Sequence, residues 1–97
     1  MSQEHLIQAV KNEIVLYAGA SFTSQAYSLF DEESLRYAVV VVPNLPRPYP
    51  SRVIVMARIL DNKIYIDEDI TDKPLVDALV YNSEIPREQI VLVYTGE

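Results

Sequence analysis

Two long apolar stretches separated by a proline cluster constrain the fold more than any other feature of the chain. Residues 35–42 end in four consecutive valines, and residues 52–60 are again mostly apolar. Because β-branched side chains favour extended backbone, both stretches are predicted to be strands that are apolar on both faces. Between them, four prolines occur in eight residues: Pro43, Pro46, Pro48 and Pro50. Proline cannot donate a backbone hydrogen bond to a sheet, so this segment is predicted to be a stiff, extended loop.

Periodicity predicts a helix at the start of the chain. Apolar residues recur there every four positions, at Leu6, Val10, Ile14 and Ala18. This spacing gives one apolar stripe, so a helix is predicted over residues 3–18, ending at Gly19. A second, shorter helix is predicted over residues 73–82, because Thr71 or Asp72 can accept hydrogen bonds from its free N–H groups.

The remaining segments predict an α+β domain. Residues 26–31 and 89–94 have strand patterns, and Asp61-Asn62 marks a tight hairpin before the strand 63–67, since both residue types tolerate positive φ. The predicted order is α-β-β-β-β-α-β in a single domain, residues 1–97. We expect an antiparallel sheet of about five strands with two helices packed on one face.

Charge and composition narrow the classes of function. Eight lysines and arginines against fourteen acidic residues give a net charge of −6, so we expect no strong direct binding to nucleic acid. The absence of cysteine excludes disulfides and thiolate chemistry. No apolar run reaches the length of a membrane span and no signal peptide is expected, which favours a cytoplasmic protein. Because 49% of the residues are hydrophobic and one sheet face has no predicted cover, we expect a two-fold homodimer.

Few residues could support catalysis or bind a metal. His5, the only histidine, falls in the first turn of the predicted helix, where a solvated side chain is favoured over a general base. Asp67, Glu68 and Asp69 form the densest acidic cluster, and carboxylates suit calcium or magnesium. The segment lacks the glycine and the spacing of an EF-hand loop, so a solvated connection between strand and helix is the favoured interpretation. We therefore expect no enzyme activity, no metal and no cofactor.

The proline loop is the candidate partner-binding site. Tyr49 lies inside it as an anchor, with Arg47 and Arg52 to orient a partner. Tyrosine and arginine are over-represented among interface hot spots, and a stiff loop loses little entropy on binding. The competing interpretation is a plain rigid connector whose prolines protect a strand edge from unwanted pairing.

Four motifs in the second half of the chain form a distinctive combination: Asp61-Asn62-Lys63-Ile64-Tyr65-Ile66-Asp67, Thr71-Asp72, Leu79-Val80 and Ile85-Pro86-Arg87-Glu88-Gln89-Ile90-Val91-Leu92. Together they resemble the XisI family, the fdxN element excision controlling factor XisI-like proteins, which are small and mostly cyanobacterial. The chain departs from the family pattern in having Asn62 and Glu84 where that pattern has glycine, and Tyr65 where it has tryptophan. The Gly-Trp segment usual after the second strand of the family is replaced by the proline loop.

The resemblance implies a function but no catalytic residue. XisI-like proteins accompany a nuclease-like protein, XisH, and are linked to the excision of a DNA element during cell differentiation. The resemblance therefore implies a non-catalytic accessory or regulatory protein that contacts an XisH-like partner in the control of excision. The alternative is a direct DNA-binding excision factor, for which the chain offers only eight scattered basic residues.

Overall fold

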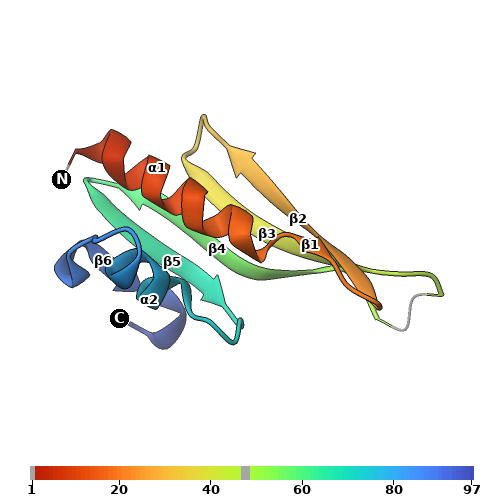
Figure 1. Ribbon diagram of the computed structural model, residues 1–97. Coiled ribbons are helices and arrows are strands. Elements are labelled where there is room, and N and C mark those ends of the chain that lie inside the picture. The colour runs from red at the N-terminus through yellow and green to blue at the C-terminus, as the bar shows by residue number, and fades with distance from the viewer. Residues whose placement is uncertain (1, 47–48) are drawn as a thin grey trace.

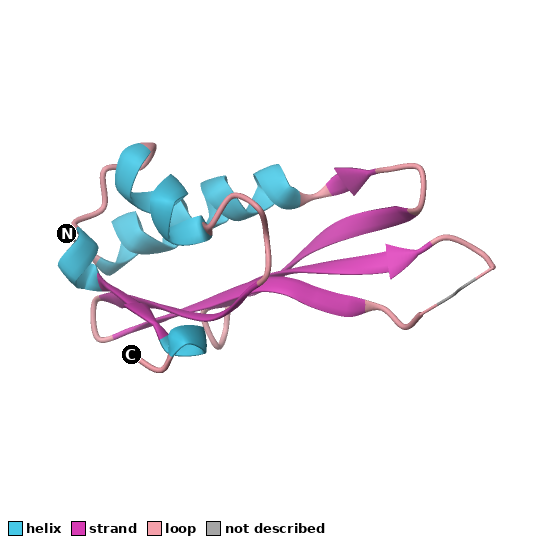
Figure 2. Cartoon of the chain, turned by 90° about the horizontal axis from the view of Figure 1, so that it is seen from below, coloured by secondary structure: helices cyan, strands magenta, loops and turns pink. Residues whose placement is uncertain are grey.

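A computed structural model describes residues 2–46 and 49–97 (Figure 1). It contains two α-helices and one six-stranded sheet, with single 3₁₀ turns at 15–17, 87–89 and 93–95. The elements are α1 (Gln3–Ile14), β1 (Gly19–Ala20), β2 (Ser24–Asp31), β3 (Arg36–Pro43), β4 (Arg52–Leu60), β5 (Lys63–Asp69), α2 (Leu75–Tyr81) and β6 (Ile90–Leu92). Both helices lie on one face of the sheet (Figure 2), so the predicted α+β architecture is confirmed.

The sheet is antiparallel except at one edge. Its strand order follows the sequence, β1-β2-β3-β4-β5-β6, and β5 and β6 are parallel. The expected antiparallel pairing therefore holds for every strand pair of the described sheet except β5–β6, where α2 carries the chain back over the sheet before β6 begins. Two neighbouring parallel strands require such a crossover connection, whereas the consecutive antiparallel strands from β1 to β5 are joined by turns or loops.

Element boundaries also differ from the expected ones. The first helix stops at Ile14 and continues as a 3₁₀ turn to Tyr17, so the apolar stripe extends beyond the α-helical hydrogen bonds. The second helix is shorter than predicted. The expected last strand, 89–94, is reduced to three residues, because the backbone turns into a 3₁₀ turn at Val93.

The core lies between the helices and the covered face of the sheet. The apolar stripe of α1 supplies Leu6, Val10 and Ile14, all fully buried, and α2 supplies Leu75 and Leu79. Alternate residues of the sheet face them from the other side: Tyr37, Val39, Val55, Ala57, Ile59, Ile64, Ile66 and Ile90. Alternation with a period of two is what a sheet with one covered face requires.

The uncovered face of the sheet is less apolar than its strands suggested. Arg58 of β4 lies opposite Tyr65 of β5, with its guanidinium 4.7 Å from the centre of the ring. Its Nε also donates to both carboxylate oxygens of Asp67, at 3.0 and 3.1 Å. A stacked and ion-paired arginine therefore occupies part of the face that we expected to be apolar throughout.

The strands extend beyond the helices at one end of the molecule. Twelve residues make α1 about 18 Å long, whereas the nine residues of β4 span about 30 Å. The β1–β2 turn and the described parts of the β3–β4 loop, 44–46 and 49–51, project from this end, away from both helices (Figures 1 and 2). The molecule is accordingly elongated, with extents of 45 × 25 × 22 Å.

The hairpin between β4 and β5 has the turn that its sequence predicted. Asp61 and Asn62 both adopt positive φ, 50° and 59°, as a type I′ turn requires. The backbone oxygen of Asn62 also accepts a hydrogen bond from Gln89 Nε2 at 3.0 Å, so the turn is held against the segment before β6.

Substitutions at Asn62 test this turn. We expect Asn62→Gly to leave stability nearly unchanged, because glycine adopts positive φ without strain. Asn62→Val should lower the free energy of unfolding by about 1–2 kcal/mol, since a β-branched residue is strained there. Urea denaturation of both variants measures the difference, and equal midpoints would contradict the assigned turn.

Candidate partner-binding site

The uncovered end of the sheet carries the two most exposed large apolar side chains of the described chain, Phe22 and Leu45. Phe22 in the β1–β2 turn is fully exposed, Leu45 in the β3–β4 loop is 82% exposed, and Tyr49 is 49% exposed. We call the turn 20–24 and the described residues 43–46 and 49–52 at the β3–β4 loop together the apolar tip. Several exposed apolar side chains on neighbouring segments form a candidate binding surface, because a partner that buries them removes apolar area from water.

Hydrogen bonds from Asn44 join the two segments of the apolar tip. Its backbone N–H donates to Thr23 O at 2.9 Å, and its side-chain Nδ2 donates to Phe22 O at 3.0 Å. Within the turn, Ser21 N donates to Ser24 O at 2.9 Å and Ser24 N donates to Ser21 Oγ at 3.2 Å. The backbone that carries Phe22 is therefore held in place on both sides.

The structure locates two of the three predicted partner-site residues. Tyr49 lies in the apolar tip, and Arg52 is exposed at the start of β4. Arg47 lies outside the described residues. Phe22 was not among the predicted residues, because it is more than twenty positions from the proline loop and only the pairing of β2 with β3 brings the two together. Its one signal in the sequence is a phenylalanine inside an otherwise small and polar segment, 19–25.

A groove between the helices is a second candidate binding surface. It has a volume of about 590 Å³ and lies between the end of α1 and the segment from Asp72 to Asn82, along the length of α2. Exposed Leu16 and Tyr81 stand at its rim, and buried Glu13 forms part of its floor. Glu13 accepts hydrogen bonds from Ser83 Oγ at 2.7 Å and from Asn82 Nδ2 at 3.4 Å, so its carboxylate ties the two helices together.

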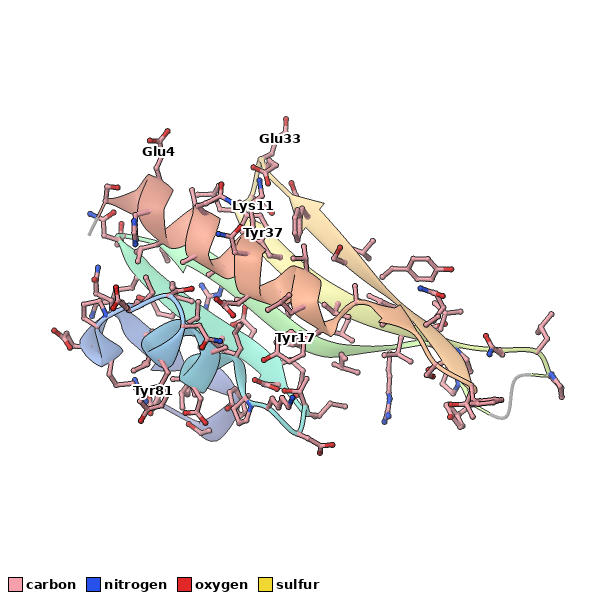
Figure 3. The ribbon with its side chains drawn as sticks, viewed as in Figure 1. Glu4, Lys11, Tyr17, Glu33, Tyr37 and Tyr81 are labelled. Carbon is pink, nitrogen blue, oxygen red and sulfur yellow. The ribbon has the colours of Figure 1, made fainter. Side chains whose placement is uncertain are left out.

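Tyr17 closes one side of this groove. Figure 3 shows it between the end of α1 and α2, and its hydroxyl donates a hydrogen bond to Lys73 O. Burial, and to a lesser extent the Asp69 carboxylate, raises the pKa of Tyr17. The hydroxyl is therefore a protonated hydrogen-bond donor at neutral pH, which suits a role in packing.

The acidic cluster does not converge on a common point. Asp67 binds Arg58 on the uncovered face, whereas Asp69 turns toward the start of α2. Asp69 accepts from Leu75 N at 2.7 Å and from Thr71 N at 2.9 Å. The predicted capping residues are therefore wrong: Asp69 supplies the carboxylate at the start of α2, and Asp72 is exposed. The cluster is also not simply solvated, because two of its three carboxylates have structural partners.

The remaining candidates for chemistry stay apart. His5 is exposed on the first turn of α1, and its backbone N–H donates to the Ser2 hydroxyl at 3.3 Å. In the parts of the chain that the structure describes, no three acidic, histidine or cysteine side chains come close enough to hold a metal ion. The same residues include no helix long and apolar enough to cross a bilayer.

Comparison with known proteins gives one family and a common fold. The model of the family described as XisI protein matches residues 2–97. The chain resembles the crystal structure of a XisI-like protein from Anabaena variabilis ATCC 29413, with 24% identity and a TM-score of 0.73 over 95% of this chain and 83% of that one. It also resembles the fdxN element excision controlling factor XisI from the same organism, with 22% identity and a TM-score of 0.64 over 93% and 86%. No curated protein sequence matches.

The carboxylate at the start of α2 gives a direct test of the local geometry. We expect Asp69→Ala to lower the free energy of unfolding by about 1–2 kcal/mol, because it removes the acceptor for the first N–H of α2. The matched control Asp72→Ala should change it by less than about 0.5 kcal/mol, since that side chain is exposed. Chemical denaturation followed by circular dichroism measures both, and the reverse order would restore Asp72 as the cap.

Proposed function

The chain belongs to the XisI family, and from that premise we propose that it is a cytoplasmic, non-catalytic accessory protein that binds a protein partner through its apolar tip. The observation that carries the proposal is the full exposure of Phe22 beside Leu45 on a backbone fixed by hydrogen bonds. Aromatic and large aliphatic side chains held in place lose little entropy on binding, which favours their use in an interface.

The partner that we propose is an XisH-like protein, and the process is the control of DNA element excision. One structural relative is named an fdxN element excision controlling factor, which supports the choice of process. The choice of partner follows from the family resemblance. A nuclease-like partner would supply the chemistry, while this chain would supply a binding surface. The scattered positions of His5, Asp67 and Asp69 are consistent with that division.

The alternative function is direct binding to DNA as an excision factor. It requires several basic side chains on one surface, because phosphate contacts provide most of the affinity for DNA. The basic residues of the described chain are instead distributed over α1, β3, β4, β5 and the segments beside α2. Lys11, Arg58 and Arg87 also form ion pairs with Glu32, Asp67 and Glu97. Protein binding is therefore the better supported function.

Variants of the apolar tip test the proposed partner site. We expect Phe22→Ser with Leu45→Ser to raise the Kd for the XisH-like protein of the same genome by at least about 30-fold, because loss of two anchors costs at least about 1 kcal/mol each. Isothermal titration calorimetry measures the affinity, and melting temperature checks the fold. The matched control is Leu16→Ser with Tyr81→Ser, which removes two large, mostly exposed apolar side chains at the groove. A weaker complex only in the control would place the partner in the groove.

A second experiment separates the two functions. We expect fluorescence anisotropy to detect no binding of the isolated chain to a 30-base-pair duplex below about 10 μM protein at 150 mM salt, because the net charge is −6. A sub-micromolar Kd that weakens steeply with salt would support direct DNA binding instead.

A further inference from the structure

The outer edge of β2 is open over most of its length. β1 pairs only with Gln25 and Ala26, so residues 27–31 have a strand neighbour on one side alone. This segment lies at the edge of the sheet, beyond α1 (Figure 1). An open edge presents unpaired backbone N–H and C=O groups, which can pair with a strand from another chain.

The register identifies which groups point outward. Asn44 N donates to Thr23 O, so these residues form a hydrogen-bonded pair in the β2–β3 ladder. Hydrogen-bonded pairs alternate along an antiparallel ladder, so Tyr27, Leu29 and Asp31 bond to β3 in turn. Ser28 and Phe30 therefore direct their backbone N–H and C=O groups away from the sheet.

The opposite edge of the same sheet, at β6, is protected from pairing with another strand, in contrast to the open edge of β2. At β6, Ile90 O accepts from Arg87 Nη1 at 2.6 Å, and Leu92 N donates to Glu97 Oε1 at 2.9 Å. Side chains thus occupy the backbone groups of that edge. The segment 27–31 has no proline, lysine or bulge, the usual protections of an edge strand.

Apolar side chains accompany the open edge. Tyr27 is 51% exposed, Leu29 is 54% exposed and Phe30 is 38% exposed. No charged residue occurs between Tyr27 and Phe30, in a chain whose net charge is −6. A partner strand at this edge would therefore gain backbone hydrogen bonds and bury apolar surface at the same time.

We propose that the open edge binds a second copy of the chain, with the two β2 strands antiparallel about a two-fold axis at Leu29. Ser28 of each copy then lies opposite Phe30 of the other copy. The two-fold axis makes two such pairs, and each pair exchanges two backbone hydrogen bonds, four in all. Leu29 lies opposite the same residue of the second copy in a non-hydrogen-bonded pair, where side chains approach most closely. The two sheets become one continuous sheet.

The second copy fits this edge because the segment 27–31 is self-complementary. β1 already pairs with β2 before Tyr27, and β2 ends in a turn after Asp31. In an antiparallel pair centred on Leu29, Tyr27 of one copy lies opposite Asp31 of the other, so the free segment begins and ends at the same place in both copies. Small Ser28 lies opposite large Phe30, and Asp31 lies opposite Tyr27, so no like charges meet. This contact uses the strand edge, whereas the sequence suggested that a dimer would cover the apolar face.

A cysteine cross-link tests the register, because the natural chain contains no cysteine. Leu29→Cys places two thiols opposite each other across the two-fold axis, within reach of a disulfide. We expect mild oxidation at 20 μM protein to give a covalent dimer of about 22 kDa, twice the 11.0 kDa chain. The matched control Leu16→Cys, at a more exposed leucine that lines the groove between the helices, should cross-link at least tenfold more slowly. Equal rates would overturn the proposal.

Sedimentation equilibrium tests the edge itself. The wild-type chain should sediment as a dimer at micromolar concentration, and Ser28→Pro should give a folded monomer, because it removes an outward N–H that β3 does not use. Ser28→Ala, which keeps that N–H, should remain a dimer. If Ser28→Pro fails to fold, Leu29→Lys gives the same test, because two lysines would face and repel each other across the two-fold axis. That variant should be a monomer, whereas the control Leu16→Lys should remain a dimer.

The possible outcomes separate this inference from the proposed function. A wild-type monomer at 100 μM, or a dimer that survives both Ser28→Pro and Leu29→Lys, would overturn the edge pairing. The tip variant Phe22→Ser with Leu45→Ser should remain a dimer, since the tip is outside the segment 27–31. Loss of the dimer in that variant alone would also overturn it and place the contact at the tip.

Discussion

The short helices can cover only one end of a sheet whose strands are longer than they are. Fully buried side chains concentrate where α1 and α2 lie, from Leu6 to Ile14 on one side and along β3 to β5 on the other. Beyond the helices, β2, β3 and β4 continue without cover and depend on one another and on Asn44. The core therefore stabilises one half of the molecule and leaves the other half as exposed surface. That division, more than any single residue, determines where a partner could bind.

Local patterns predicted the parts of the fold that depend on neighbouring residues. The stripe of Leu6, Val10 and Ile14 identified α1, and Asp61-Asn62 identified the turn with positive φ, because both signals act within a few residues. The parallel pairing of β6 could not be read in the same way, since it depends on where α2 carries the chain. The cap of α2 was assigned incorrectly for a related reason: Asp69 reaches Leu75 across six residues of irregular backbone.

The candidate site shows the same limit. Proline content identified the β3–β4 loop and Tyr49 within it, because proline acts on its own backbone. Phe22 gained its importance only from the pairing of β2 with β3, which places its turn beside that loop. The acidic cluster was misleading in the opposite sense. Strict alternation would put Asp67 and Asp69 on the same face, but the β4–β5 register shifts between Met56 and Ala57, so the two carboxylates acquired different partners.

The two proposed contacts occupy different parts of the molecule, and their geometry is compatible. The apolar tip lies at the end where β2 begins, whereas the two-fold axis passes near Leu29, toward the end where β2 stops. In an antiparallel pair of β2 strands, the beginning of one strand points away from the beginning of the other. A dimer built in this way would present its two tips in opposite directions. Each tip would remain open to a partner, so one dimer could bind two partner molecules, one at each end.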